Sequence, residues 1–338
     1  MPKIPQNVLN TTFYLYPSRG DAEEGTNFGG TGFLVLVPSE MHGKYGRGYV
    51  YGVTNWHVAC RGSSVIRLNT ISGKPDIQEF GPEEWFFDPR YDVAVRQILI
   101  DPAVHKTTVI SVDMLLTKDD VKLAEIGPGD DVFMLGRFMD HDGGRDINLP
   151  AARFGNISID PSPIEQENGR KADCYCIDLH SRSGYSGSPV FVYRTPGSDL
   201  GPKSPQAILL AGANLFKLLG IHCAQFPEMW EVTAGGKLKD ETSEPLLTDG
   251  RYIRGFSGMT VVIPAWVMIL EMPTLKDGRA NGDARQEQHF KKHGYPLIAE
   301  NGAPSADVPS PATDKDPNHR ENFNSVLREA VRKPESKD

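Results

Sequence analysis

Short runs of β-branched and aromatic residues, separated by clusters of Gly, Pro and Asp, recur along most of this chain. Runs of this kind are typical of β-strands, and the clusters between them are typical of turns. Two sets of runs follow one another, and each has the rhythm of a small antiparallel barrel. The first set is Thr12–Tyr16, Thr31–Val37, Tyr49–Thr54, Val65–Asn69 and Asp92–Ile100. The second set is Asp131–Phe138, Ala152–Ile159, Asp173–Leu179, Pro189–Tyr193, Ala207–Leu210, Leu218–Ala224 and Met259–Ile263.

Breaks in this pattern divide the chain into three parts. Residues 1–117 are predicted to form an N-terminal barrel, and residues 118–272 a C-terminal barrel that opens with a helical turn or two at Lys118–Ile126. Pro264 begins an apolar run that stops before Pro273, so a short closing helix is expected there. Residues 273–338 are rich in Pro and polar residues, which predicts a disordered tail.

Within this tail, Pro317–Val331 carries apolar residues at roughly helical spacing. It could be an amphipathic segment that docks on a regulatory protein partner or on the body, or a solvated helix or coil.

Composition excludes several classes of protein. The 338 residues carry a net charge of −8 and no basic cluster, so nucleic-acid binding is not expected. The N-terminus lacks the apolar run of a secretory signal, and no apolar run is long enough to cross a membrane, so we expect a cytoplasmic protein without a membrane partner. Four cysteines in a chain of this length are too few for a disulfide scaffold and are expected to be buried thiols.

Three motifs contain the candidate catalytic residues. Val53-Thr54-Asn55-Trp56-His57 comes first, Tyr91-Asp92-Val93-Ala94-Val95 follows, and Gly184-Tyr185-Ser186-Gly187-Ser188-Pro189 comes last. A carboxylate that orients an imidazole, and an imidazole that takes the proton of a hydroxyl, are the parts that make a serine nucleophilic. His57, Asp92 and Ser186 are therefore predicted to be catalytic.

With Gly30-Thr31-Gly32-Phe33 added, these motifs resemble the chymotrypsin-like (trypsin-fold) serine proteases, in particular the bacterial trypsin-like peptidases. The resemblance covers roughly residues 31–272. It implies two six-stranded antiparallel β-barrels with the active site in the cleft between them, a polypeptide substrate and no cofactor. It also implies that the backbone N–H groups of Gly184 and Ser186 form the oxyanion hole. Tyr185 stands where zymogen-activated relatives have Asp, so activation by propeptide cleavage is not implied.

The resemblance extends to the primary specificity pocket. Leu219–Ala224 resembles the strand that forms one wall of that pocket, and His222 is similar in position to a His of the glutamyl endopeptidases and viral 3C-like proteases. His180 and Ser181 fall where the base of the pocket would lie. These groups could bind the carboxylate or carboxamide of Glu or Gln, or His222 could be a wall residue without selective effect.

Other clusters predict no ligand. Asp140–Asp146 is rich in oxygen ligands but lacks the closing Glu of a calcium loop, so a mobile loop between strands is expected. His289 and His293 lack the Glu of a zinc-protease motif, and Gly29–Gly32 lacks the Lys of a phosphate-binding loop. We expect no metal and no cofactor. Two rival functions remain, an esterase and a latent or inactive protease-fold module that needs a partner.

Overall fold

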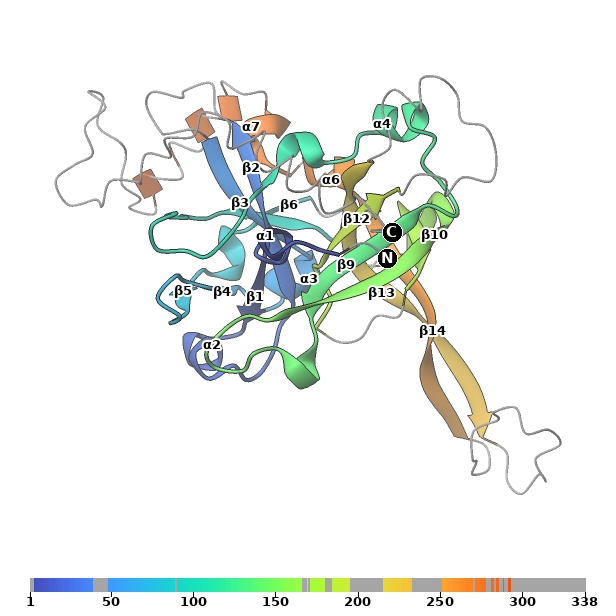
Figure 1. Cartoon of the computed structure of the whole chain (residues 1–338), viewed down its shortest axis with the longest axis horizontal. Coiled ribbons are helices and arrows are strands. Elements are labelled where there is room, and N and C mark those ends of the chain that lie inside the picture. Colours follow the sequence, from blue (N-terminus) through green and yellow to red (C-terminus); the bar gives the residue numbers. More distant parts are fainter. Residues whose placement is uncertain are drawn as a thin grey trace, which may run out of the picture.

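The computed structural model describes residues 3–38, 48–88, 90–165, 169, 171–179, 184–194, 215–232, 251–269, 271–277 and a few positions between 281 and 292. Strands dominate these residues, and they form a curled sheet and a barrel that lie next to each other (Figure 1). The prediction of an all-β, chymotrypsin-like two-barrel fold is confirmed at the level of fold class.

The N-terminal part is a curled sheet that carries His57 and Asp92 at its strand ends. In the described ranges it has eight strands, in the order β5-β4-β1-β2-β3-β7-β6, with β8 paired in parallel to β2. The strands are β1 (Thr12–Tyr16), β2 (Thr31–Pro38), β3 (Gly48–Thr54), β4 (Val65–Leu68), β5 (Asp76–Gln78), β6 (Phe86–Phe87), β7 (Ala94–Gln97) and β8 (Ile110–Ser111).

This sheet differs in detail from the predicted six-stranded barrel. As far as the structure describes the chain, its edge strands β5 and β6 do not pair with each other, so hydrogen bonding leaves the sheet open. The added strands β5, β6 and β8 have two or three residues each, too few for an alternating pattern to be recognised in sequence. Short helices flank the sheet: α1 (Gln6–Leu9), α2 (Arg19–Glu24), α3 (Trp56–Ala59) and the 3₁₀ turns η1 (Pro82–Glu84) and η2 (Val112–Met114).

The C-terminal part is a closed six-stranded barrel, as predicted, with the order β10-β11-β14-β13-β12-β9. Helix α4 (Lys118–Leu123) leads into it and begins with a capping box between Thr117 and Asp120. Its strands are β9 (Asp131–Arg137), β10 (Pro150–Glu165), β11 (Lys171–Asp178), β12 (Pro189–Tyr193), β13 (Phe216–Val232) and β14 (Arg251–Pro264).

Strands β13 and β14 are longer than the sequence predicted, and their paired register runs from Gly220↔Pro264 to Val232↔Arg251. The outer half of this hairpin projects away from the barrel in Figure 1. The strand predicted at Ala207–Leu210 lies outside the described residues.

One apolar cluster spans the sheet and the barrel and holds them together. Val35, Val53 and Val95 of the sheet belong to the same buried cluster as Leu135 and Ile221 of the barrel. Burial of apolar side chains from both parts in one cluster favours their association. The strand ends that carry the predicted catalytic residues therefore come from two parts with a shared core.

Helical structure continues beyond residue 272, where the predicted C-terminal barrel ends. Helix α6 (Ala265–Ile269) is the predicted closing helix, and a second helix, α7 (Pro273–Lys276), follows with Pro273 buried at its start. Proline suits the first turn of a helix, since its missing N–H has no partner there anyway. None of the helices within the described ranges has the length and apolarity that a membrane crossing requires.

The segment between β9 and β10 is anchored to the sheet by Arg67 of β4, whose side chain is fully buried. Its guanidinium donates to Asn148 Oδ1 at 2.8 Å and to the carbonyl oxygens of Gly144 and Ile147 at 2.9 and 3.2 Å. Asp142 of the same segment pairs with the buried Arg137 at 2.5 Å. The expected mobile loop at Asp140–Asp146, which overlaps η3 (Met139–His141), thus lies in a segment with buried polar anchors that sequence spacing did not reveal.

Candidate active site

His57 and Asp92 form a hydrogen-bonded pair at the rim of the sheet. His57 lies in α3, one turn after the end of β3, and Asp92 lies just before β7, which pairs with β3. His57 Nδ1 is 2.6 Å from Asp92 Oδ2, and the His57 backbone N–H donates to Asp92 Oδ1 at 2.9 Å. The Asp92 side chain is 1% exposed and that of His57 is 21% exposed. A buried carboxylate that holds an accessible imidazole in one orientation is the arrangement that a general base needs.

Asn55 binds the main chain of Asp92, a role that the sequence analysis did not assign to it. It is fully buried, and its Nδ2 donates to the Asp92 backbone carbonyl at 2.8 Å. As the residue that precedes α3, it joins the ends of two neighbouring strands. The position of Asn55 in the motif, two residues before His57, is the signal that could have identified it.

Ser186 lies in a tight turn between β11 and β12 and is half-buried. Gly184 and Gly187 have φ of +95° and +84°, a backbone region that favours glycine. The turn is closed by a hydrogen bond from Ser188 N to the Tyr185 carbonyl at 3.0 Å, and Gly187 N donates to the His222 carbonyl at 3.0 Å. The glycines of the motif are therefore required by the backbone path around Ser186.

Gly30 lies where the Ser186 turn meets helix α3. A Cβ at Gly30 would lie 2.7 Å from the Ser186 carbonyl oxygen and 2.9 Å from Val58 Cγ2, next to His57. Only a residue without a side chain allows this approach, so the turn from the barrel and the helix from the sheet meet here. Within the described residues no hydrogen bond joins Ser186 Oγ to His57, a contact that often tightens only when substrate binds.

The predicted oxyanion donors, Gly184 N and Ser186 N, belong to this same turn. Neither amide donates a hydrogen bond within the part of the chain that the structure describes. Tyr185 between them is fully buried, and its hydroxyl accepts from Arg153 Nε at 3.3 Å. In this chain the side chain after Gly184 therefore packs into the barrel.

His222, the predicted wall of the specificity pocket, is buried behind the Ser186 turn. Its side chain is hydrogen-bonded to Thr260 Oγ1 at 3.2 Å, and its backbone N–H donates to the Ser188 carbonyl at 3.0 Å. Burial, with a smaller effect of the nearby His57, lowers the pKa of His222 to about 3, although a backbone hydrogen bond with Tyr185 acts in the opposite direction. The imidazole is thus neutral at physiological pH. His180 and Ser181 lie outside the described residues.

Cysteine nucleophiles are disfavoured near this site. Burial and the charge of Asp92 raise the pKa of Cys60 to about 12. A hydrogen bond with Cys174, followed by burial, raises the pKa of Cys223. Since the thiolate is the reactive form, these raised pKa values disfavour both thiols as nucleophiles at neutral pH. All four cysteines lie in described ranges, and none of them forms a disulfide there.

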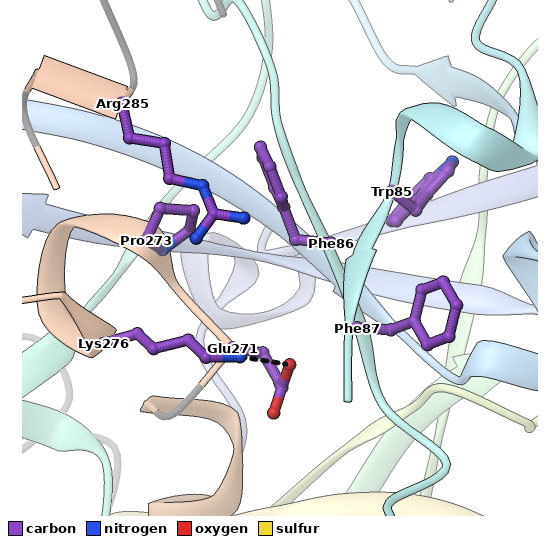
Figure 2. A pocket seen from close by; sticks show the side chains of 7 residues that line it. All are labelled: Trp85, Phe86, Phe87, Glu271, Pro273, Lys276 and Arg285. Carbon is purple, nitrogen blue, oxygen red and sulfur yellow. Dashed lines mark ion pairs between the residues drawn. The ribbon is translucent and has the colours of Figure 1, made fainter. Parts of the chain in front are cut away.

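A separate pocket of about 190 Å³ lies between the β6 segment and α7 (Figure 2). It is lined by Trp85, Phe86, Phe87, Glu271, Pro273, Lys276 and Arg285. Glu271 is buried, and Figure 2 shows its carboxylate paired with Lys276, whose Nζ is 3.8 Å away. Burial raises the pKa of Glu271 to about 7. Phe87 also packs against Trp56, the neighbour of His57, with ring centroids 6.2 Å apart.

In the described ranges, no group of three or more His, Cys, Asp or Glu side chains is placed to hold a metal ion.

No family model matches the chain, and no curated protein matches it at a significant level. Solved structures do resemble it. The protease domain of MamO from Magnetospirillum magneticum, in its apo form, is 14% identical with a TM-score of 0.42, over 78% of this chain and 96% of that one. Deg5 is 20% identical with a TM-score of 0.38, over 65% and 81%. The active form of the Rv3671c protease from M. tuberculosis is 17% identical with a TM-score of 0.38, over 81% and 88%.

Proposed function

We propose that this protein is a serine endopeptidase that cleaves peptide bonds with Ser186 as nucleophile, His57 as general base and Asp92 as the residue that orients His57. The observation that carries the proposal is the 2.6 Å bond between His57 Nδ1 and the buried Asp92 carboxylate, beside the half-buried Ser186 turn. Because Asp92 accepts a hydrogen bond from the Nδ1 proton, Nε2 of His57 is the basic nitrogen, which is the atom that must take a proton from Ser186.

The reaction proceeds in two stages. Ser186 Oγ attacks the peptide carbonyl while its proton moves to His57 Nε2, and the C–N bond then breaks as His57 returns that proton to the departing amine. In the second stage water attacks the acyl-enzyme with His57 again as base, which releases the acid and restores Ser186. The Asp92 carboxylate stabilises the imidazolium that forms in both stages.

The oxyanion would be bound by the N–H groups of Gly184 and Ser186. Two observations support this assignment: neither amide is used within the described structure, and both belong to the glycine-shaped turn around the nucleophile. A missing donor at such a site typically lowers the rate by about 10²–10³-fold.

We also propose that the enzyme prefers Gln or Glu before the scissile bond, and that His222, His180 and Ser181 contribute to the pocket that selects this residue. One ring nitrogen of His222 is hydrogen-bonded to Thr260, and the neutral imidazole carries no charge to offset a carboxylate, so Gln should be favoured over Glu. A library of peptides that vary only at this position tests the preference, with His222→Ala as the variant. Equal cleavage after Gln, Leu and Lys would overturn it.

The function itself is tested with a fluorophosphonate probe on the purified full chain, beside Ser186→Ala, with mass spectrometry to locate the adduct. We expect an adduct on Ser186 in the wild type and none in the variant, because only an activated serine reacts rapidly with this class of probe. Absence of any adduct would favour the inactive module, and the search would turn to partners that bind the C-terminal tail. Turnover of activated esters without turnover of peptides would favour the esterase.

A further inference from the structure

Thr31, the first residue of β2, is bonded to the Ser186 turn from the opposite part of the molecule. It is fully buried. Its backbone N–H donates to the Ser186 carbonyl at 2.8 Å, and its Oγ1 donates to the Gly184 carbonyl at 2.8 Å. Both carbonyls that flank Tyr185 in the nucleophile turn are therefore held by one residue of the sheet.

The same hydroxyl also accepts a hydrogen bond. Arg137 N, at the end of β9, donates to Thr31 Oγ1 at 3.0 Å. The carbonyl of Thr31 accepts from Thr54 Oγ1 at 2.8 Å, one residue before Asn55. Because Thr31 Oγ1 both donates and accepts a hydrogen bond, its O–H bond has one favourable orientation, which points toward the Gly184 carbonyl. Thr31 thus connects the nucleophile turn with the end of the strand that leads to His57.

These bonds restrict the two proposed oxyanion donors. The Gly184 and Ser186 carbonyls belong to the peptide groups that follow these two residues, so Thr31 holds the peptide groups on both sides of the one that carries the Ser186 N–H. The Gly184 N–H is attached to the Cα that precedes the first of these held groups, so its direction depends on the same part of the turn. Gly184 has a φ of +95° and no side chain, so without an external bond its peptide groups would rotate at little cost. Catalysis by an oxyanion hole requires donors that are already aimed before the charge develops.

We propose that Thr31 is a positioning residue, which fixes the Gly184 and Ser186 carbonyls and so holds the turn in the conformation in which the Gly184 and Ser186 amides face the oxyanion. This inference rests on the proposed serine-peptidase function. It assigns a specific task to the hydroxyl: the hydroxyl touches no substrate, yet its loss should slow the chemical step and leave substrate affinity nearly unchanged. Without the Thr31 hydroxyl, the buried Gly184 carbonyl and Arg137 N–H would lose their hydrogen-bond partner, and the turn would shift to satisfy them.

The test compares Thr31→Val, which keeps the shape of the side chain and removes the hydroxyl, with Thr31→Ser, which keeps the hydroxyl. The readouts are inactivation by a fluorophosphonate, separated into affinity and maximal rate, and kcat and KM for p-nitrophenyl acetate. We expect the maximal rate of Thr31→Val to fall on the order of 10²-fold, the loss typical of misplaced catalytic groups, with affinity and KM little changed. Thr31→Ser should retain a rate close to that of the wild type.

A matched control separates positioning from general loss of stability. Thr11 is also fully buried, and its hydroxyl donates to the Val8 carbonyl at 2.7 Å, but it lies outside the Ser186 turn. Thr11→Val should lower the thermal unfolding midpoint and leave the inactivation rate unchanged. If Thr31→Val does not fold, Thr31→Ala removes the same hydroxyl without a second methyl against the Gly184 carbonyl, and the same loss of rate is expected.

The outcomes distinguish the two proposals. A wild type that reacts at Ser186, with Thr31→Val equally fast, would overturn the positioning role and leave the peptidase function intact. Loss of rate in both Thr31→Val and Thr31→Ser would also overturn it, because the hydroxyl would then not be the cause. A wild type that forms no adduct would overturn the peptidase function and the role of Thr31 together. A slow Thr31→Val with a normal Thr31→Ser would support both.

Discussion

At the scale of single residues, the Asp92 carboxylate decides which nitrogen of His57 is basic. Asp92→Asn replaces an acceptor with a group whose amide donates, so the other tautomer of His57 is favoured and Nε2 no longer accepts a proton. We expect kcat for an activated ester to fall on the order of 10⁴-fold at pH 7 while the protein remains folded.

The control for this variant is Asp173→Asn, an exposed carboxylate in β11 that should leave kcat unchanged. Near-normal turnover of Asp92→Asn would show that His57 does not depend on Asp92 for its orientation.

Glu271 makes stability depend on pH. Its pKa rises from 4.5 in the unfolded chain to about 7 in the folded protein because its carboxylate is buried. A carboxyl whose pKa is higher in the folded state contributes stability below pH 4.5, and this contribution is lost as pH rises through 7. The loss amounts to at most about 3 kcal/mol.

Glu271→Gln should remove this part of the pH dependence. The free energy of unfolding, measured in urea at pH 5 and pH 8, should fall less between the two values in the variant than in the wild type. An equal fall in both proteins would assign the pH dependence to other groups.

At the scale of elements, Arg67 connects strand β4 to the segment between β9 and β10. Its guanidinium donates to four backbone or side-chain oxygens, including the Ala22 carbonyl at 3.0 Å. Arg67→Met retains much of the volume but leaves these buried oxygens without donors. We expect the free energy of unfolding to fall by about 3 kcal/mol or more, measured by urea denaturation.

Arg19 offers the contrast, since its ion pairs with Glu23 and Glu79 join side chains that are more than half exposed. Arg19→Met should leave the unfolding midpoint unchanged within error, because exposed ion pairs contribute little. If both variants were equally stable, Arg67 would not anchor the segment.

At the scale of the whole molecule, the folded part extends past the boundary that composition suggested. Pro273 at the start of α7 is buried, and Leu275 of α7 packs against the apolar cluster shared by the sheet and the barrel. Removal of residues 273–338 should therefore lower the thermal unfolding midpoint.

We propose that removal of residues 293–338 alone leaves the thermal unfolding midpoint nearly unchanged, because the composition of that segment offers little apolar surface to bury. A large drop with the shorter truncation would show that the tail docks on the body.

Elements with a strong local signal were predicted well. The runs at Thr12–Tyr16 and Pro189–Tyr193 match β1 and β12 residue for residue, since alternating or continuous apolar patterns reflect strand burial directly. The outer part of the β13–β14 hairpin was missed, because its sequence lacks such a pattern and its pairing depends on the partner strand.

Some features of the candidate site could likewise be predicted from local sequence, and others could not. His57, Asp92 and Ser186 were identified by their flanking motifs, and the glycines around Ser186 follow from the turn they must make. The sequence alone thus determined the all-β class and most strands of both parts, and it supplied the residues that we propose as catalytic. It did not reveal that Thr31 binds the Gly184 carbonyl, 153 residues away, or that Arg67 binds Asn148, 81 residues away. Nor did it reveal that His222 is buried against Thr260. Local patterns record the burial of an element's own faces, whereas these contacts exist only once the sheet and the barrel have packed, so the tertiary structure alone decides them.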